Sequence, residues 1–162
     1  MKWTLPFVIA ASPAFADVCP PAADHSAAIA AIIAELPFAK TEMEGREMSQ
    51  KLWPLWLDAP NAQAQALLDE GMSRRSVYDL LGAREVLGRL IDYCPDYAEG
   101  YNQRAFASYL AQDFASALVD LDRALELSPN HAAAMSGKAL ALMGLGGLLL
   151  GWLRHKPGAR AS

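Results

Sequence analysis

A unit of 34 residues constrains the fold of this chain more than any other sequence feature. From 98 to 131 the chain reads AEGYNQRAFASYLAQDFASALVDLDRALELSPNH. Apolar residues at helical spacing predict one helix from about Glu99 to Ala111 and another from about Phe114 to Leu127, with Gln112 and Asp113 in the turn. Ser128-Pro129-Asn130 ends the second helix. The unit is therefore predicted to be a helical hairpin.

The same register returns along the chain at a distance of 34 residues. Ala105 is a small residue of the kind that lets two helices cross closely. Gly71 takes its place one unit earlier, and Ala139 takes it one unit later. Pro95 likewise precedes Pro129 by one unit. The third copy begins in register and then loses the pattern, so about two and a half units are expected.

This unit resembles the tetratricopeptide repeat. Tyr101 stands at the first aromatic position of that motif, Ala105 at the glycine position, Ala117 at the alanine position and Pro129 at the closing proline. The resemblance implies an all-α fold, a helical-hairpin solenoid with an N-terminal helical cap. Arg104 replaces the leucine of the motif, and we expect it to form a structural ion pair with Asp120 or Asp122.

The expected organisation has six parts. Residues 1–16 form a signal peptide, 17–63 the N-terminal helical cap, 64–97 a divergent repeat, 98–131 a repeat, 132–153 a partial repeat or capping helix, and 154–162 a basic tail.

Two helices are expected within the cap. Residues 24–36 carry an isoleucine-rich face that Pro37 ends, and Thr41 with Glu44 has capping-box spacing at the start of the second helix. A kink is expected at Pro54. This pair could stack on Ala64 to Arg75. Trp53 and Trp56 are interpreted as core residues, with a ligand platform as the alternative.

The N-terminus predicts export. Lys2 precedes the short apolar run Trp3 to Ala11, and Ala14-Phe15-Ala16 is a small-residue cleavage pattern. Cleavage after Ala16 would give a periplasmic or secreted bacterial protein, whereas a buried N-terminal helix is the alternative. Val18 is unsuited to a lipoprotein signal before Cys19.

Cys19 and Cys94 are the two cysteines, and in an oxidising compartment they are candidates for a disulfide. Two unpaired thiols, with Cys94 buried at a helix end, are the alternative. His25, His131 and His155 are dispersed without ligand spacing, so neither a metal nor a cofactor is expected. His25 and His131 each lie near a helix start and are interpreted as surface or capping residues.

Charge and hydropathy bear on the partners. With 14 basic and 18 acidic side chains the net charge is −4, which does not suit a nucleic-acid partner. The uncharged stretch Ala139 to Leu153 is shorter than the roughly 20 residues that a membrane-spanning helix needs. Peripheral membrane contact by the tail remains a less favoured alternative. No nucleophile–base pair or phosphate loop stands out in the sequence, so an enzyme is not expected.

The resemblance implies a module that binds a protein or peptide in a concave groove. Together with the predicted export, this would be a binding module of the bacterial cell envelope. Its candidate lining residues are Arg75, Met72, Leu68, Glu99, Asn102, Phe106 and Tyr109. Asn102 lacks the neighbouring lysine of the carboxylate grip known in the family. The alternative function is a structural subunit of an envelope complex, with the C-terminal tail as the contact.

Overall fold

The computed structural model describes residues 18–155, and these residues fold into helices without a strand. In chain order the elements are α1 (Ser26–Glu35), the 3-10 helix η1 (Leu36–Phe38), α2 (Glu42–Gln50), α3 (Trp53–Trp56), α4 (Ala62–Ser76), α5 (Leu80–Tyr93), α6 (Ala98–Leu110), α7 (Phe114–Leu127) and α8 (Ala132–His155). The predicted signal peptide, residues 1–16, lies outside the described residues.

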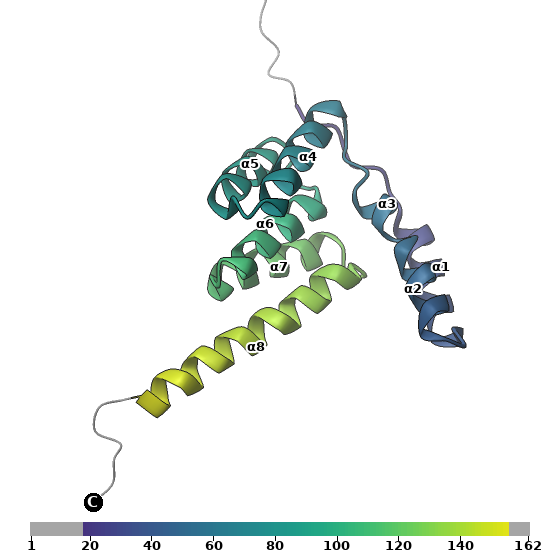
Figure 1. Ribbon diagram of the computed structural model, residues 1–162. Helices are drawn as coiled ribbons and strands as arrows, with labels where there is room; N and C mark the ends of the chain where they lie inside the picture. Colours follow the sequence, from purple (N-terminus) through teal and green to yellow (C-terminus); the bar gives the residue numbers. More distant parts are fainter. Residues whose placement is uncertain (1–17, 156–162) are drawn as a thin grey trace, which may run out of the picture.

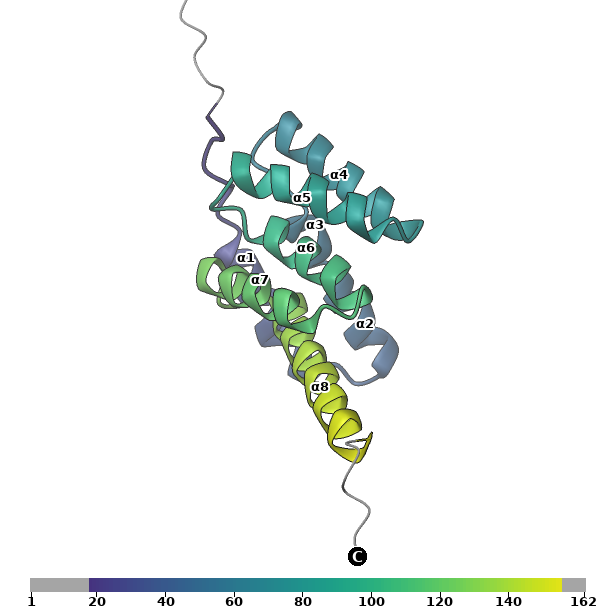
Figure 2. The same ribbon diagram turned by 90° about the vertical axis from the view of Figure 1, so that its left-hand side faces the viewer.

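Helices α4 and α5 form one hairpin and α6 and α7 form the next, stacked in chain order with α8 after them (Figures 1 and 2). The turns of the two hairpins are built alike. Tyr78 and Gln112, one repeat unit apart, have φ angles of 62° and 60°. Asp79 and Asp113 follow them and cap α5 and α7 by accepting hydrogen bonds from backbone N–H groups. The predicted all-α helical-hairpin solenoid is confirmed.

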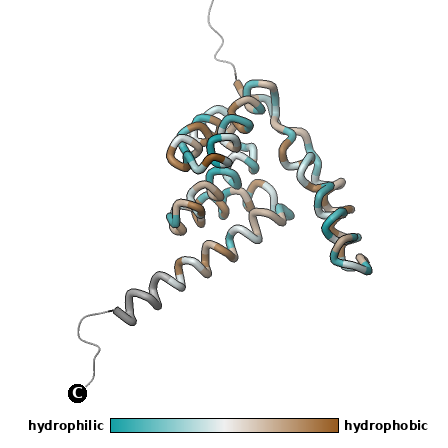
Figure 3. The backbone as a smooth tube through the Cα atoms, viewed as in Figure 1, coloured by the Kyte–Doolittle hydropathy of each residue, from teal (hydrophilic) through white to brown (hydrophobic). Residues whose placement is uncertain are grey.

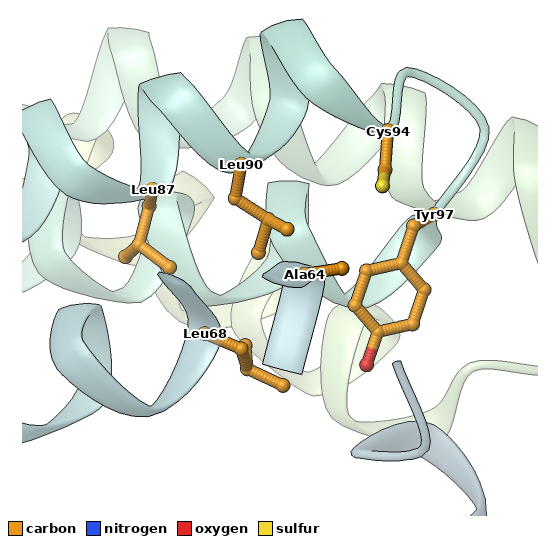
Figure 4. Close-up of a cluster of buried hydrophobic side chains, with 6 residues drawn as sticks. All are labelled: Ala64, Leu68, Leu87, Leu90, Cys94 and Tyr97. Carbon is orange, nitrogen blue, oxygen red and sulfur yellow. The ribbon is translucent and has the colours of Figure 1, made fainter. Parts of the chain in front are cut away.

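Small residues set the close approach of the paired helices. A Cβ atom on Gly71 of α4 would lie 2.6 Å from the Leu87 side chain of α5. In the second hairpin Ala105 and Ala117 are fully buried where α6 meets α7. Figure 4 shows Leu87 and Leu90 of α5 pointing towards α4 in the first hairpin. These contacts form the core of the repeats.

Helix α8 continues where the repeat register would place a turn and a second helix. Ala134 and Ala141 are buried against the preceding hairpin. A Cβ on Gly144 would lie 2.6 Å from the Phe114 ring. Glycine and alanine on one face therefore let α8 lie close to α7, and the rest of the third unit prolongs the same helix. Over its coloured part α8 is mostly hydrophobic or intermediate in hydropathy, with little hydrophilic character (Figure 3). None of the helices described has the length and apolar character needed to cross a bilayer.

The N-terminal helices do not stack on α4, as a cap on Ala64 to Arg75 would. Figure 1 shows them leaving α4 as a separate arm. Ile29, Leu52 and Trp56 form a small core that packs against Ala132 and Ala133 at the start of α8. The arm therefore reaches past the first repeat, because its apolar face finds its partner on α8.

Two local predictions for the arm have different outcomes. Thr41 accepts a hydrogen bond from the Glu44 N–H at 3.1 Å, so the predicted helix start is confirmed. The predicted single helix kinked at Pro54 is instead divided into α2 and α3. Pro54 lies in the first turn of α3, where its missing N–H costs no hydrogen bond.

Cys19 and Cys94 form the predicted disulfide, with their Cα atoms 5.2 Å apart. Cys94 is buried at the end of α5, and Cys19 packs on the same core beside Tyr97. The bond fixes the segment before α1 to the junction between the two repeats.

Candidate functional site

A groove of about 600 Å³ lies between α4, α6 and α8, with α3 at its edge. Its lining is largely apolar. The residues are Trp53, Leu57, Met72, Arg75, Asn102, Gln103, Ala105, Phe106, Tyr109, Leu121, Ala133, Ser136, Gly137 and Leu140. Helix α6 supplies the middle of this surface, since Asn102, Phe106 and Tyr109 are three or four residues apart and share a face.

Five of the seven residues predicted for the groove line it: Met72, Arg75, Asn102, Phe106 and Tyr109. The structure places the other two elsewhere. Leu68 is fully buried and packs in the core between α4 and α5. Glu99 is 1% exposed and lies beneath the groove surface. Repeat spacing finds the helix that faces the groove, but it does not separate residues that project into it from neighbours that pack sideways.

Arg75 and Phe106 form a cation–π contact across α4 and α6. The guanidinium carbon lies 4.4 Å from the centre of the ring. Among the described side chains Arg75 forms no salt bridge, although it is half-buried. Burial lowers the pKa of Arg75 below its usual value, and the nearby negative charge of Glu99 partly opposes this. Arg75 still keeps its charge, so the groove has an unpaired cation in apolar surroundings.

Below the groove surface, Glu99 anchors a buried polar network. It accepts hydrogen bonds from Asn102 at 3.0 Å and from the Gln103 side-chain amide, and His131 Nε2 lies 2.8 Å from its carboxylate. Asn102 and Gln103 also line the groove, so Glu99 fixes the orientation of both. The Gln103 carbonyl oxygen is buried and has no hydrogen-bond partner among the described residues.

His131 joins this network to the N-terminal arm. Its ring stacks on Trp56 with centroids 4.5 Å apart, and it also accepts a weak hydrogen bond from the Ala134 N–H at the start of α8. The interpretation of His131 as a capping residue is therefore supported, whereas a surface position is wrong because it is 1% exposed. Tyr97 donates to the Trp56 carbonyl at 2.8 Å, which adds a second tie between the arm and the repeats.

The two tryptophans of α3 have different surroundings. Trp56 is a core residue, as predicted. Trp53, also interpreted as core, is partly exposed and lines the groove. The two rings lie edge to face at 5.5 Å, so Trp56 supports Trp53 at the groove edge. Their spacing of three residues predicts that both rings lie on one side of a helix. The sequence does not show that the arm folds back to α8, which places Trp53 at the groove.

Tyr109 and Arg104 are two further residues for which the sequence predicts a role, one in the groove and one in an ion pair. Tyr109 is half-buried and packs on Phe114 at 5.6 Å, so its ring serves both core and groove. Arg104 binds Asp120 through two hydrogen bonds of 2.6 and 2.8 Å, which confirms the predicted ion pair. His25 pairs with Asp58 at 2.7 Å within the arm. Within the described part of the chain, no cluster of three or more histidine, cysteine or acidic side chains could hold a metal ion.

Several known proteins are similar to this chain. It is 42% identical over 65 residues to a tetratricopeptide repeat protein 36 homolog of Nematostella vectensis, covering 40% of this chain and 36% of that protein. It is 38% identical over 95 residues to human tetratricopeptide repeat protein 36, covering 59% and 48%. A TPR repeat-containing protein of Rhizobium etli is 33% identical over 64 residues, covering 40% and 31%. The chain spans less than half the length of each.

A solved structure is also similar, the TPR2AB-domain:pHSP90-complex of yeast Sti1. It aligns with a TM-score of 0.51 and 25% identity, over 72% of this chain and 47% of that chain. No protein-family model matches the sequence.

Proposed function

We propose that this chain, which belongs to the tetratricopeptide-repeat family, binds a peptide segment of a partner protein in the groove between α4, α6 and α8. The groove itself carries the proposal. Exposed aromatic side chains, Phe106 and Trp53, lie in it beside an unpaired guanidinium. Monomeric proteins rarely leave such groups together in a hollow unless the hollow binds something.

The polar groups of the groove indicate the chemistry of the bound segment. Arg75 would pair with a carboxylate, because an unpaired and half-buried cation gains most from an opposite charge. Apolar side chains would cover Phe106 and Leu140. An extended peptide or a short helix with one acidic residue and apolar neighbours meets both needs.

The similar proteins support this proposal in kind. The Sti1 structure is by its name a complex with pHSP90. This chain has no lysine beside Asn102, so its anion contact would rest on Arg75. The groove offers binding chemistry, and a non-catalytic role is part of the proposal.

The site of action is proposed to be the periplasm or the exterior of a bacterial cell. Two observations support this location. The sequence of residues 1–16 has the pattern of a signal peptide, and the two cysteines of the chain form a disulfide. Intact-mass analysis of protein recovered from the periplasm should find Asp17 at the N-terminus. Recovery of full-length protein with Met1 from the cytoplasm would contradict export.

Site-specific photo-crosslinking in cells tests the binding site. A photoreactive phenylalanine analogue at position 106 should capture a partner segment that mass spectrometry can map. The matched control is position 119, because Val119 on α7 is 70% exposed and does not line the groove. Equal capture of the same partner from both positions, or capture from 119 alone, would refute the groove as the site.

A further inference from the structure

The face of α8 that a second helix of its repeat would cover is open. In the preceding repeat Tyr101 and Ala105 of α6 pack in one cluster with Leu121 of α7. One unit of 34 residues later, Met135 and Ala139 occupy the same register on α8. Met135 is 45% exposed and Ala139 is exposed as well, because α8 runs on to His155 where α6 turns back.

Leu142 and Gly146 extend this open face along α8. The four residues, Met135, Ala139, Leu142 and Gly146, are spaced by four, three and four positions, so they form one stripe. Leu142 is 51% exposed, and a Cβ added to Gly146 would meet nothing within 4 Å. We call these residues the α8 stripe. They do not include Ser136, Gly137 or Leu140, which line the groove.

Large and small residues alternate along the α8 stripe. The helix pairs of this protein already use such alternation, since Gly71 of α4 receives Leu87 of α5. An antiparallel helix with the inverse order of sizes would therefore fit the stripe. The stripe itself has that inverse order when read backwards. In an antiparallel pair centred between residues 140 and 141, Met135 faces Gly146 of the other helix and Ala139 faces Leu142.

We infer that α8 pairs with α8 of a second copy of this chain about a two-fold axis. A two-fold axis across a helix makes the two copies antiparallel, the relation that α6 has to α7. No charged residue lies between Ala139 and Gly147, so like charges do not meet at the centre. Lys138, on the flank, is neutralised by Asp122 at 2.6 Å. This pairing leaves the groove residues outside the contact and is independent of the proposed function.

Light scattering coupled to size-exclusion chromatography tests the pairing on the intact chain. Light scattering should give the wild type twice the mass of its own single chain, as measured by intact mass on the same sample. Gly146→Met should abolish the dimer, since two large residues would then oppose each other. Gly147→Met is the matched control, because Gly147 also has open space around it but lies off the stripe, and it should stay dimeric. Circular dichroism should show equal helix content in all of them.

A reciprocal change separates specific packing from general loss of assembly. Met135→Ala combined with Gly146→Met restores a small residue opposite each large one, so the double variant should recover the dimer. A monomeric wild type, a Gly146→Met variant that still dimerises, or a double variant that stays monomeric would overturn the proposal. A monomer that co-sediments with phosphatidylglycerol vesicles would overturn it too, and would assign the stripe to a lipid surface.

Discussion

Single residues decide how closely neighbouring helices approach one another. Gly71 and Gly144 lie where a neighbouring side chain, Leu87 or Phe114, occupies the space of a missing Cβ. Gly88 is different, since a Cβ there would meet only the end of the Arg104 side chain at 3.7 Å. Glycine in a helix costs about 1 kcal/mol relative to alanine, so only close packing justifies it at Gly71.

Gly71→Ala is expected to destabilise the fold although alanine favours helix. Leu87 is fully buried and cannot move away, and overpacking of this kind costs about 1–3 kcal/mol. The net loss in the free energy of unfolding should be about 1 kcal/mol. Gly88→Ala is the matched control and should gain up to about 1 kcal/mol. Thermal unfolding of the two variants measures these changes. A Gly71→Ala protein with a higher melting temperature than the wild type would contradict the packing described.

Asp113 stabilises the start of α7, and its contribution should depend on pH. It accepts a hydrogen bond from the Ser116 N–H at 3.2 Å and pairs with Arg84 at 3.1 Å. The contacts with Ser116, and to a lesser extent Arg84, lower the pKa of Asp113 below its usual 3.8. A lowered pKa in the fold means that this stabilisation is complete above the unfolded value and is lost as the pH falls through the folded value.

Asp113→Ala should therefore lower the free energy of unfolding by about 1 kcal/mol at neutral pH, as loss of a helix cap does. The difference from the wild type should narrow below about pH 4 as the wild-type carboxyl is protonated. Urea unfolding at neutral pH and near pH 3 measures both. Asp113→Asn, which keeps a capping oxygen, should lose less at neutral pH. If the difference in unfolding free energy between Asp113→Ala and the wild type widened at low pH, this role of Asp113 would be contradicted.

Residue size and spacing predicted the packing inside the repeats better than the lining of the groove. Ala105, Ala117 and Arg104 could be placed because each contacts a residue within its own hairpin. Leu68 and Glu99 were misplaced, because whether they face the groove or the core depends on how one hairpin packs on the next. Glu99 is buried by its bonds with Asn102, Gln103 and His131, and helical periodicity carries no sign of that network.

At the scale of whole elements, one expectation from the sequence was not met: the arm from α1 to α3 packs on α8 and does not stack on Ala64 to Arg75. The third unit, expected as a partial repeat or a capping helix, lies within the single helix α8. The packing of the arm depends on contacts between segments about 80 to 100 residues apart, where no repeat register applies. The second hairpin, which rests on contacts inside one unit, matched its expected helix boundaries within one residue.

The disulfide should contribute strongly to the free energy of unfolding. It closes a loop with a sequence separation of 75 between Cys19 and Cys94. The chain-entropy model gives about 4 kcal/mol for a loop of that length. Urea unfolding with and without a phosphine reductant should show a lower midpoint on reduction. A Cys19→Ala, Cys94→Ala protein should not respond to the reductant, and an equal midpoint for wild type in both conditions would contradict the contribution.

At the scale of the whole molecule, the arm, the two hairpins and α8 together make the groove. Trp53 comes from the arm, Arg75 from the first repeat, Phe106 from the second and Leu140 from α8. No single repeat contains it. The docking of the arm through Trp56 and His131 therefore places the edge of the groove that Trp53 forms.

Calorimetric titration tests most directly whether this groove binds a partner segment. The segment captured from position 106 would be synthesised as a peptide and titrated into wild type, Phe106→Ala, Arg75→Ala and Val119→Ala. If the groove binds the segment, Phe106→Ala and Arg75→Ala should each weaken binding about tenfold or more, as expected of central contacts. Val119→Ala should bind as the wild type does. Unchanged affinity in both groove variants, with their helix content intact, would contradict the account.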